Sequence, residues 1–257
     1  MIELKNISLE IYPPGKKILR QISWHIGRDE KWVLFGRNGS GKTKLLEIVT
    51  GYNFPSSGEV LRFGKSALGH DIREIRKGIG YISTLLSNKF SPSETILDTV
   101  LSGLYASIGI YVTPGRKETV RAMELLDTAA MADRARDRFG ILSDGEKQKV
   151  LMLRAFINEP DLLIFDEPAT HLDLPAREDL LGAIGKLCSI KPVSMIYVTH
   201  HTEEIAPLFE NIFILGEGRC LYRGPVREGL SEDIMAEVFG RDIMVMEFSG
   251  RFYTMVR

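Results

Sequence analysis

The sequence predicts an α/β fold: a parallel sheet covered by helices, with an antiparallel β region near the N-terminus and a helical segment inserted between strands. Three observations in the 257-residue chain support it. Apolar strand-like runs alternate with helical patterns, as in parallel sheets whose strands are joined by helices. Near the N-terminus, apolar and polar residues alternate with the period of half-buried strands. Between about residues 85 and 158 the patterns are mainly helical. The length suggests one or two domains.

The N-terminal elements follow in order along the chain. Residues 7–11 and 22–26 alternate apolar with polar side chains on either side of a Pro-Pro-Gly turn, so we expect two antiparallel strands. Residues 31–35 form a continuous apolar strand that runs into Gly36. A short helix is expected next, which Gly51 ends.

Start signals place the helices of the middle region. Ser91 is a candidate N-cap, with Pro92 at the first helical position and Glu94 completing a capping box. Residues 116–132 and 144–156 have amphipathic helical patterns. We therefore expect at least three helices here.

Strands return in the last third of the chain, at residues 162–165, 193–198 and 212–215. The helical segments between them imply a parallel sheet. The pattern of residues 242–257 predicts a β-hairpin that turns at Ser249-Gly250, with Ile243, Val245 and Phe252 on one face. We expect a main domain over residues 1–230, with the helical subdomain inserted at about 85–158, and a C-terminal extension over residues 231–257.

Composition excludes several classes of protein. The chain has 33 Lys and Arg against 34 Asp and Glu, a net charge of −1, so bulk electrostatic binding to nucleic acid or anionic lipid is not expected. Cys188 and Cys220 are far apart and form no zinc motif, which is typical of reduced thiols in the cytoplasm. No signal peptide is visible, and no uncharged run reaches the roughly 20 apolar residues that a spanning helix needs. We expect a cytoplasmic protein with no membrane span of its own.

A glycine-rich segment between the strand at 31–35 and the following helix matches the pattern G-x-x-x-x-G-K-[ST]. It reads Gly36-Arg37-Asn38-Gly39-Ser40-Gly41-Lys42-Thr43. Small residues allow backbone N–H groups to wrap phosphates, and the positive end of the helix adds to the attraction. Lys42 would reach the β- and γ-phosphates, and the Thr43 hydroxyl would bind Mg²⁺. The segment predicts a nucleoside triphosphate site.

Acidic and histidine residues follow two of the predicted strands. Asp166 and Glu167 come at the end of a buried run, where parallel strands form the ligand edge of a sheet. Asp166 suits Mg²⁺, and Glu167 can accept a proton from an attacking water. His200 ends the next strand and could donate a hydrogen bond to the γ-phosphate or orient the carboxylate. The other histidines show no metal-binding spacing, so no metal besides Mg²⁺ is expected.

A short segment, Leu142-Ser143-Asp144-Gly145-Glu146, precedes the acidic strand. Ser143 is predicted to be an N-cap with Glu146 at the third helical position, and the helix end could also grip a phosphate. With this segment, the chain resembles the ATP-binding cassette (ABC) ATPases over about residues 1–230. The matching positions are Tyr12 as the aromatic residue that stacks on adenine, 36–43 as Walker A, 142–146 as the signature, 162–166 as Walker B, Glu167 as the catalytic glutamate, 168–173 as the D-loop region and His200 as the switch histidine.

The resemblance implies a P-loop NTPase (RecA-like) core with an antiparallel β subdomain and an inserted α-helical subdomain. It also implies hydrolysis of ATP with Mg²⁺ in a head-to-tail homodimer. Ser143 and Gly145 of one subunit would contact the γ-phosphate held by Lys42 of the other, and Asp173 would help to join the two sites. With one copy of each motif, a single chain would be catalytically incomplete.

The sequence departs from the family pattern at two places. Thr84 stands where most relatives have a glutamine that binds Mg²⁺ or water and links the site to a permease. A threonine hydroxyl could still contact the metal shell, but the side chain is shorter. With a Ser/Thr loop at this position, the chain resembles a subgroup of ABC proteins related to molybdenum-uptake ATPases. The signature has Asp144 and Glu146 where Gly and Gln are usual, and two carboxylates would repel ATP unless they point away.

Two functions are consistent with these residues. The first is the ATP-hydrolysing subunit of an ABC transporter, an importer of a metal, oxyanion or chelate, docked on a separate permease at the inner face of the plasma membrane. The alternative is a soluble, stand-alone ABC ATPase that acts on another macromolecule. Overall similarity to importer ATPases favours the first, and Thr84 favours the second.

Overall fold

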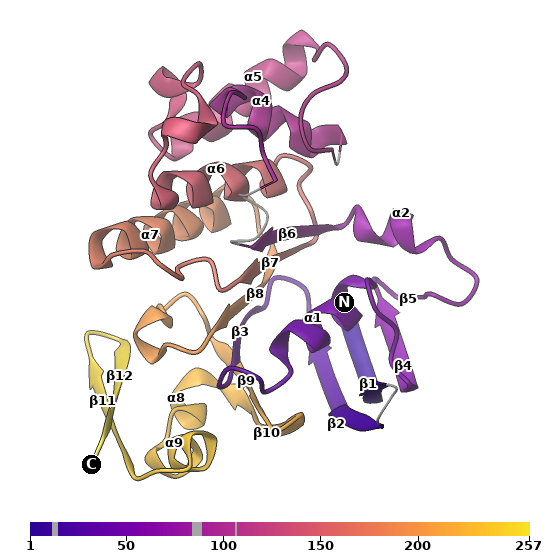
Figure 1. The fold of residues 1–257 in the computed structure, drawn as a ribbon, viewed down its shortest axis with the longest axis vertical. Coiled ribbons are helices and arrows are strands. Elements are labelled where there is room, and N and C mark those ends of the chain that lie inside the picture. The colour runs from indigo at the N-terminus through magenta and orange to yellow at the C-terminus, as the bar shows by residue number, and fades with distance from the viewer. Residues whose placement is uncertain (12–14, 84–88, 106) are drawn as a thin grey trace. The chain divides into compact units, whose positions relative to one another are not determined.

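The computed structural model describes residues 1–11, 15–83, 89–105 and 107–257 (Figure 1). The chain divides into two units, one made of Met1–Ile79 with Ser194–Arg257 and the other of Gly80–Val193. The predicted α/β fold is confirmed.

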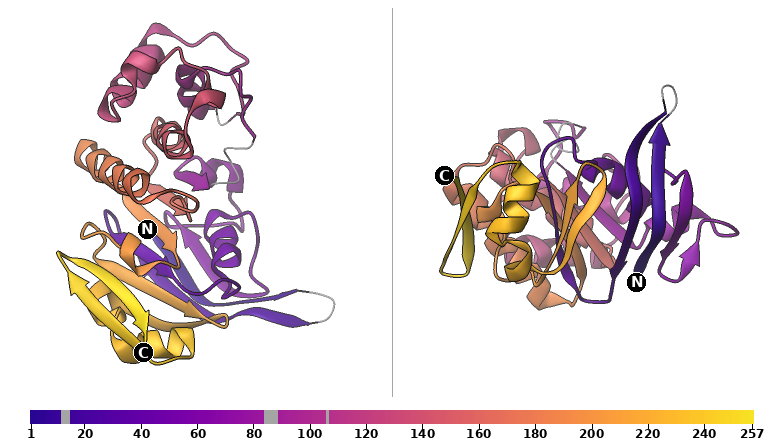
Figure 2. Two further views of the ribbon diagram at one scale, coloured as in Figure 1. Left: turned by 60° about the vertical axis from the view of Figure 1, so that its left-hand side comes forward. Right: turned by 90° about the horizontal axis from the view of Figure 1, so that it is seen from below.

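The first unit contains a four-stranded sheet of order β2-β1-β4-β5. Its strands are β1 (Ile2–Ile11), β2 (Lys16–Ile26), β4 (Ser57–Arg62) and β5 (Lys65–Ser66). β1 pairs antiparallel with both β2 and β4, as Figure 2 shows for the long β1–β2 ribbon. The predicted antiparallel strands are therefore confirmed, and each extends several residues beyond its alternating core.

The same unit holds the parallel strands on which a ligand edge depends. β3 (Lys31–Phe35) lies between β8 (Ser194–Thr199) and β9 (Asn211–Gly216) and is parallel to both, and β10 (Arg219–Pro225) pairs antiparallel with β9. All six residues of β8 are buried, as expected of a strand covered on both faces. In the register Phe35 lies opposite Thr199, so β3 and β8 end at the same edge.

Helix α1 (Lys42–Thr50) follows β3, and a buried cation stabilises its far end. Arg62 is 1% exposed; its Nε donates to the carbonyl of Val49 at 2.7 Å, and its Nη2 donates to that of Ile48. Burial, and to a lesser extent the neighbouring Arg76, lowers the pKa of Arg62 to about 10. A positive charge at a helix C-terminus complements the helix dipole and anchors α1 with its N-terminus at the glycine-rich segment.

The C-terminal residues form a helical pair and a two-stranded ribbon. Helices α8 (Val226–Gly229) and α9 (Glu232–Phe239) precede β11 (Ile243–Phe248) and β12 (Arg251–Val256), which pair antiparallel. Ser249 and Gly250 occupy the turn with φ of 50° and 73°, as a tight hairpin requires. Ile243 and Phe252 are buried on the inner face, so the predicted hairpin is confirmed.

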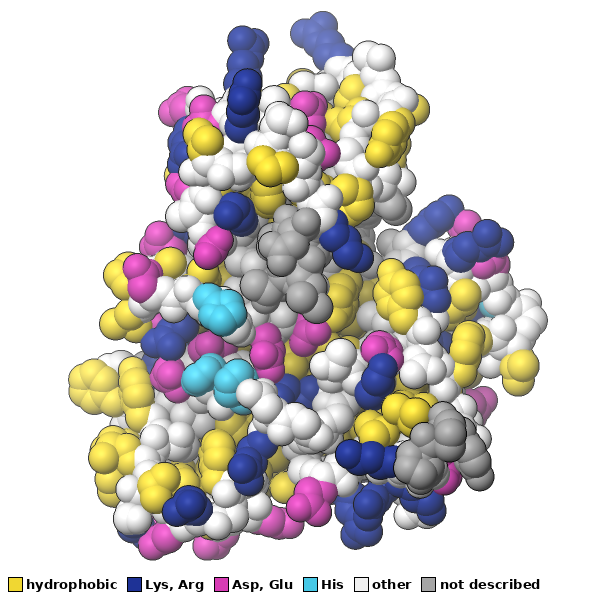
Figure 3. Space-filling view, in the orientation of Figure 1, with side chains coloured by type: hydrophobic (Ala, Val, Ile, Leu, Met, Phe, Trp, Pro, Cys, Tyr) yellow, Lys and Arg dark blue, Asp and Glu magenta, His cyan; other side chains and the backbone are white. Residues whose placement is uncertain are grey.

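The ribbon is attached to a short turn, η4 (Thr202–Glu204), in the same unit. The guanidinium of Arg251 donates to the carbonyl of Glu203 at 3.0 Å, and the hydroxyls of Thr202 and Thr254 lie 3.2 Å apart. The outer face carries exposed apolar side chains, seen in yellow at the lower left of Figure 3; they are Met246, Phe248, Tyr253 and Met255.

The second unit contains two adjacent strands, β6 (Ile79–Ser83) and β7 (Leu162–Asp166). Its helices come between these strands in the chain and after the second of them. The α-helices are α4 (Ile96–Leu101), α5 (Arg116–Thr128), α6 (Asp144–Phe156) and α7 (Leu174–Ile190), and short 3₁₀ turns are η1 (Ser102–Tyr105), η2 (Ala132–Arg134) and η3 (Phe139–Ile141). The prediction for α6 is confirmed, and α5 ends four residues earlier than expected. Among the described residues, no helix has the length and apolar composition to span a bilayer.

The predicted helix start at Ser91 is wrong. The helix begins at Thr95, whose hydroxyl accepts from the backbone N–H of Asp98 at 3.0 Å. Residues 92–93 form a turn, and Thr95 itself is extended and forms a β-bridge with Arg138. A pairing with a residue this distant in sequence overrides the local capping signal of Ser91 and Glu94.

Candidate nucleotide-binding site

The glycine-rich segment forms the connection between β3 and α1. Gly41 is the N-cap of α1 with φ of 109°, a conformation that side chains with a Cβ rarely adopt. At Gly36 a Cβ would lie 2.3 Å from the carbonyl oxygen of Leu215, so no larger residue fits there. Glycine is required at both positions for the loop to turn and to pack closely on β9.

The Lys42 side chain folds back across this loop. It is 6% exposed, and its Nζ donates to the carbonyl oxygens of Gly36 at 2.7 Å and Arg37 at 3.3 Å. Ser40 is also buried, and its hydroxyl oxygen makes no hydrogen bond with any residue that the structure describes. A buried polar atom without a partner calls for an explanation, and a ligand oxygen would supply the missing partner. Arg37, Asn38, Gly39 and Thr43 are exposed.

His200 follows β8 and lies at the same sheet edge as the glycine-rich loop, because the register pairs Thr199 with Phe35. Its ring packs against that of His201, with centroids 4.1 Å apart. The parallel register thus brings the predicted histidine to the loop that carries Lys42.

The turn that carries His200 is fixed by a buried acid that the sequence pattern does not reveal. The Glu204 carboxylate is 4% exposed and accepts from the hydroxyls of Thr199 at 2.7 Å and Tyr197 at 3.1 Å. The backbone N–H of His201 donates to the Thr199 hydroxyl at 3.0 Å. These bonds constrain both sides of His200.

In the second unit, Asp166 ends β7 and contacts a tyrosine on β6. The Tyr81 phenol donates to Oδ2 of Asp166 at 2.5 Å. Glu167 has a φ of 49°, in a region that residues other than glycine seldom occupy. Such local strain is common at functional sites. Within the described part of the chain, no group of three or more His, Cys, Asp or Glu residues could hold a metal ion.

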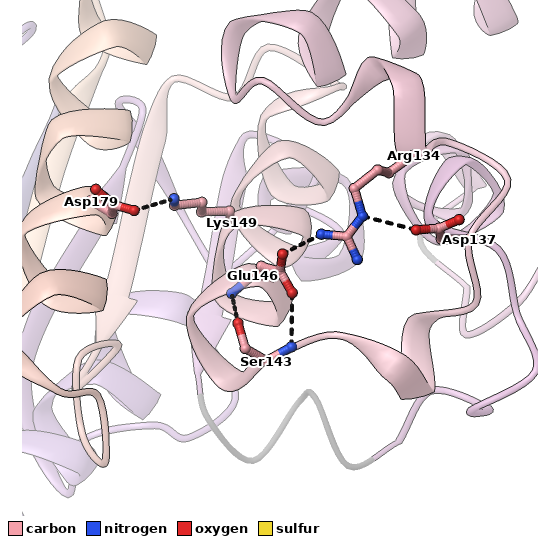
Figure 4. A network of polar contacts seen from close by, with 6 residues as sticks. All are labelled: Arg134, Asp137, Ser143, Glu146, Lys149 and Asp179. Carbon is pink, nitrogen blue, oxygen red and sulfur yellow. Dashed lines mark hydrogen bonds and ion pairs between the residues drawn. The ribbon is translucent and has the colours of Figure 1, made fainter.

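The signature segment starts α6, as predicted, with a complete capping box (Figure 4). The Ser143 hydroxyl accepts from the N–H of Glu146 at 3.3 Å, and Glu146 accepts from the N–H of Ser143 at 2.9 Å. A Cβ at Gly145 would lie 3.1 Å from that of Ala176, so α6 packs closely on α7 here. Asp173 is the N-cap of α7 and accepts from the N–H of Ala176 at 2.9 Å.

The predicted site residues therefore fall into two sets. The first unit holds residues 36–43 and His200; the second holds Asp166, Glu167, Ser143, Gly145 and Asp173. Tyr12 and Thr84 lie outside the described residues. Sequence reasoning missed Tyr81 and Glu204, because each acts through a partner on another element.

Comparison with known proteins decides which family these features represent. The family model for ABC transporters matches residues 19–170, more than half of the chain. The chain belongs to the ABC transporter ATPase family. ATP is therefore its nucleotide, and hydrolysis of ATP is its reaction.

Comparisons with individual proteins give the same family. The ABC ATPase is 40% identical over 251 residues to the ABC transporter ATP-binding protein YlmA of Bacillus subtilis, covering 96% of this chain and 93% of YlmA. It is 29% identical to the phosphonates import ATP-binding protein PhnC of Treponema denticola, covering 93% and 95%. Among solved structures, the dimeric post-hydrolysis state of the ATP-binding cassette MJ0796, bound to ADP and Pi, matches with a TM-score of 0.74 and 26% identity, covering 88% and 99%.

Proposed function

We propose that this ABC ATPase is the ATP-hydrolysing subunit of an importer for a metal, oxyanion or chelate, and that it works as a homodimer on a separate permease. The observation that carries the proposal is similarity along nearly the whole chain, because PhnC, named as a phosphonate import protein, is covered over 95% of its length. The MJ0796 cassette is a dimer, which supports the homodimer. Docking on a permease would place the ATPase at the inner face of the membrane.

The glycine-rich loop is proposed to hold the ATP phosphates. Lys42 would exchange its carbonyl partners for β- and γ-phosphate oxygens, and the buried Ser40 hydroxyl would gain the partner that it lacks among the described residues. His200 would hydrogen-bond to the γ-phosphate from the same sheet edge. Glu167 would accept a proton from the attacking water at its carboxylate.

The residues present also fit Mg²⁺. The Thr43 hydroxyl and the Asp166 carboxylate are hard oxygen donors, and Mg²⁺ in phosphate sites takes few protein ligands besides phosphate oxygens and water. When bound, Mg²⁺ would neutralise charge on the phosphates.

Tyr81 should hold Asp166 in the orientation that this site needs. Replacing it by phenylalanine removes the phenol that donates to Oδ2 but keeps the ring. Partners of metal-ligating groups typically affect metal affinity by about 10- to 100-fold. We expect Tyr81→Phe to raise the Mg²⁺ concentration for half-maximal ATP binding by about 10-fold or more. The measurement is a Mg²⁺ titration of nucleotide binding in the non-hydrolysing Glu167→Gln protein.

Tyr105→Phe is the matched control, because the Tyr105 phenol donates to a carboxylate, Glu118, away from Asp166. It should leave the Mg²⁺ titration unchanged. ATP binding without Mg²⁺ should be equal in all three proteins. A Tyr81→Phe protein that titrates like its parent would contradict this role.

The transport role is tested in the native cell. Deleting the gene should abolish uptake of the cognate solute, and the parent chain should restore uptake, whereas the Glu167→Gln variant should not. The parent chain should also be recovered from membranes together with a multi-span protein. Recovery only in the soluble fraction, without such a protein and with uptake unchanged by deletion, would instead support a stand-alone ATPase.

A further inference from the structure

The acidic signature segment has a counter-charge close to it, Arg134, shown near the start of α6 in Figure 4. Arg134 in η2 donates through Nη1 to Oε1 of Glu146, and through Nε to Oδ2 of Asp137 at 2.8 Å. The second Glu146 oxygen, Oε2, accepts from the backbone N–H of Ser143 at 2.9 Å. Both oxygens of Glu146 are therefore engaged within this unit.

Glu146 is ionised at neutral pH. Partial burial raises the pKa of Glu146, but the hydrogen bonds from Ser143 and the guanidinium of Arg134 together outweigh it, so the pKa lies below its usual range. The segment thus holds a full negative charge next to Ser143 and Gly145. A glutamine at this position would offer nearly the same shape without the charge.

We propose that Arg134 is a positioning residue for the ATP-bound dimer: its guanidinium, which Glu146 shares with Asp137, offsets the charge of Glu146 and keeps that carboxylate in the capping box, so that Ser143 and Gly145 can approach a γ-phosphate. The inference rests on the proposed function, in which the signature of one subunit contacts the ATP of its partner. Because the Ser143 oxygen accepts the N–H of Glu146, its own proton is directed elsewhere and can be donated to a phosphate.

The other signature carboxylate has a similar counter-charge. Asp144 forms an ion pair with Lys147, one turn along α6, at 3.1 Å. The two acidic departures from the family signature are therefore each matched by a basic side chain. Repulsion of ATP by this segment is reduced in both cases by the chain itself.

The pair between Arg134 and Glu146 contributes little to folding. Their side chains are 38% and 32% exposed, and exposed ion pairs add little to stability because water screens them. In the proposed ATP-bound dimer the Glu146 carboxylate would lie near the phosphates of the partner's ATP, and like charges brought together at an interface are strongly unfavourable. The consequence of losing Arg134 is therefore expected in dimer formation with ATP and not in stability.

The test compares ATP-dependent dimerisation in the Glu167→Gln background, measured by analytical ultracentrifugation. Adding Arg134→Gln should weaken the dimer by about 10-fold or more, because an unpaired carboxylate would face the nucleotide. Adding Glu146→Gln as well should restore the dimer, since the partner of Arg134 within the signature segment is then uncharged, and Asp137 lies outside that segment. The melting temperature should stay within a few degrees of the parent's throughout.

A matched control is Lys149→Gln. Lys149 lies further along α6 and pairs with Asp179 on α7 (Figure 4), so the variant breaks an ion pair away from Glu146 and should leave dimerisation unchanged. An Arg134→Gln protein that dimerises like its parent overturns the inference. So does a loss that Glu146→Gln fails to restore: with a lower melting temperature Arg134 would serve folding, and with an unchanged one it would act on the dimer other than through the charge of Glu146. If the Glu167→Gln protein itself forms no dimer with ATP, the homodimer of the proposed function is refuted, and the inference with it.

Discussion

Replacing Glu167 by glutamine should stop ATP turnover while ATP binding remains. The amide has almost the same shape as the carboxylate but cannot accept a proton from water. Loss of a general base typically costs about 10²- to 10⁴-fold in rate, so we expect kcat to fall at least about 100-fold. With hydrolysis blocked, the ATP-bound dimer should accumulate. Steady-state phosphate release and gel filtration with ATP measure the two effects.

Asp161 provides a control for Glu167. It is exposed and lies before the start of β7, at the opposite end of the strand from Asp166. Asp161→Asn should hydrolyse ATP at the parent rate. A Glu167→Gln protein that also turned over at the parent rate would show that another group activates the water.

Replacing Lys42 by alanine should weaken ATP binding and abolish turnover. The variant loses the buried ammonium group that now bonds to the carbonyls of Gly36 and Arg37. Hydrogen bonds to charged groups contribute about 1.5–3 kcal/mol, so the Kd for ATP should rise by roughly 10- to 150-fold. Turnover falls further, since the lysine also stabilises charge on the transferred phosphoryl group. Calorimetric titration with ATP measures the affinity.

Lys44→Ala is the matched control on the same helix. Lys44 pairs with Glu47 at 2.7 Å on the surface of α1, so its loss removes one positive charge without touching the loop. Its affinity for ATP should equal that of the parent. Because Lys42 also bonds to loop carbonyls, the melting temperature of both variants should be compared; unchanged ATP affinity in a folded Lys42→Ala protein would refute the phosphate-binding role of the loop.

Much of the fold follows from local sequence signals that agree with the long-range packing. The bounds of α6, its capping box and the Ser249-Gly250 turn were all predictable, because each depends on residues within a few positions of one another. The glycine-rich loop was predictable for the same reason, since its residue types are set by backbone geometry at Gly36 and Gly41.

The residues that escaped prediction depend on contacts between distant segments. Tyr81 has the pattern of an ordinary strand residue, and its bond to Asp166 exists only because β6 lies beside β7. Thr95 replaces Ser91 as the N-cap because of its bridge to Arg138. Arg134 reaches Glu146 from a separate turn, so nothing in the signature itself indicates that its charge is countered.

Because β12 is bonded to η4, the stability of the C-terminal ribbon should affect how readily the turn next to His200 unfolds on heating. A two-stranded hairpin has marginal stability by itself, so β11 and β12 depend on the surface beneath them. Since Arg251 and Thr254 bond to the turn that follows His200, that turn and the ribbon should open together as one cooperative unit. The amide protons of the ribbon and of η4 would then exchange with solvent at a common rate. Mild warming would disorder His200 before the parallel strands unfold.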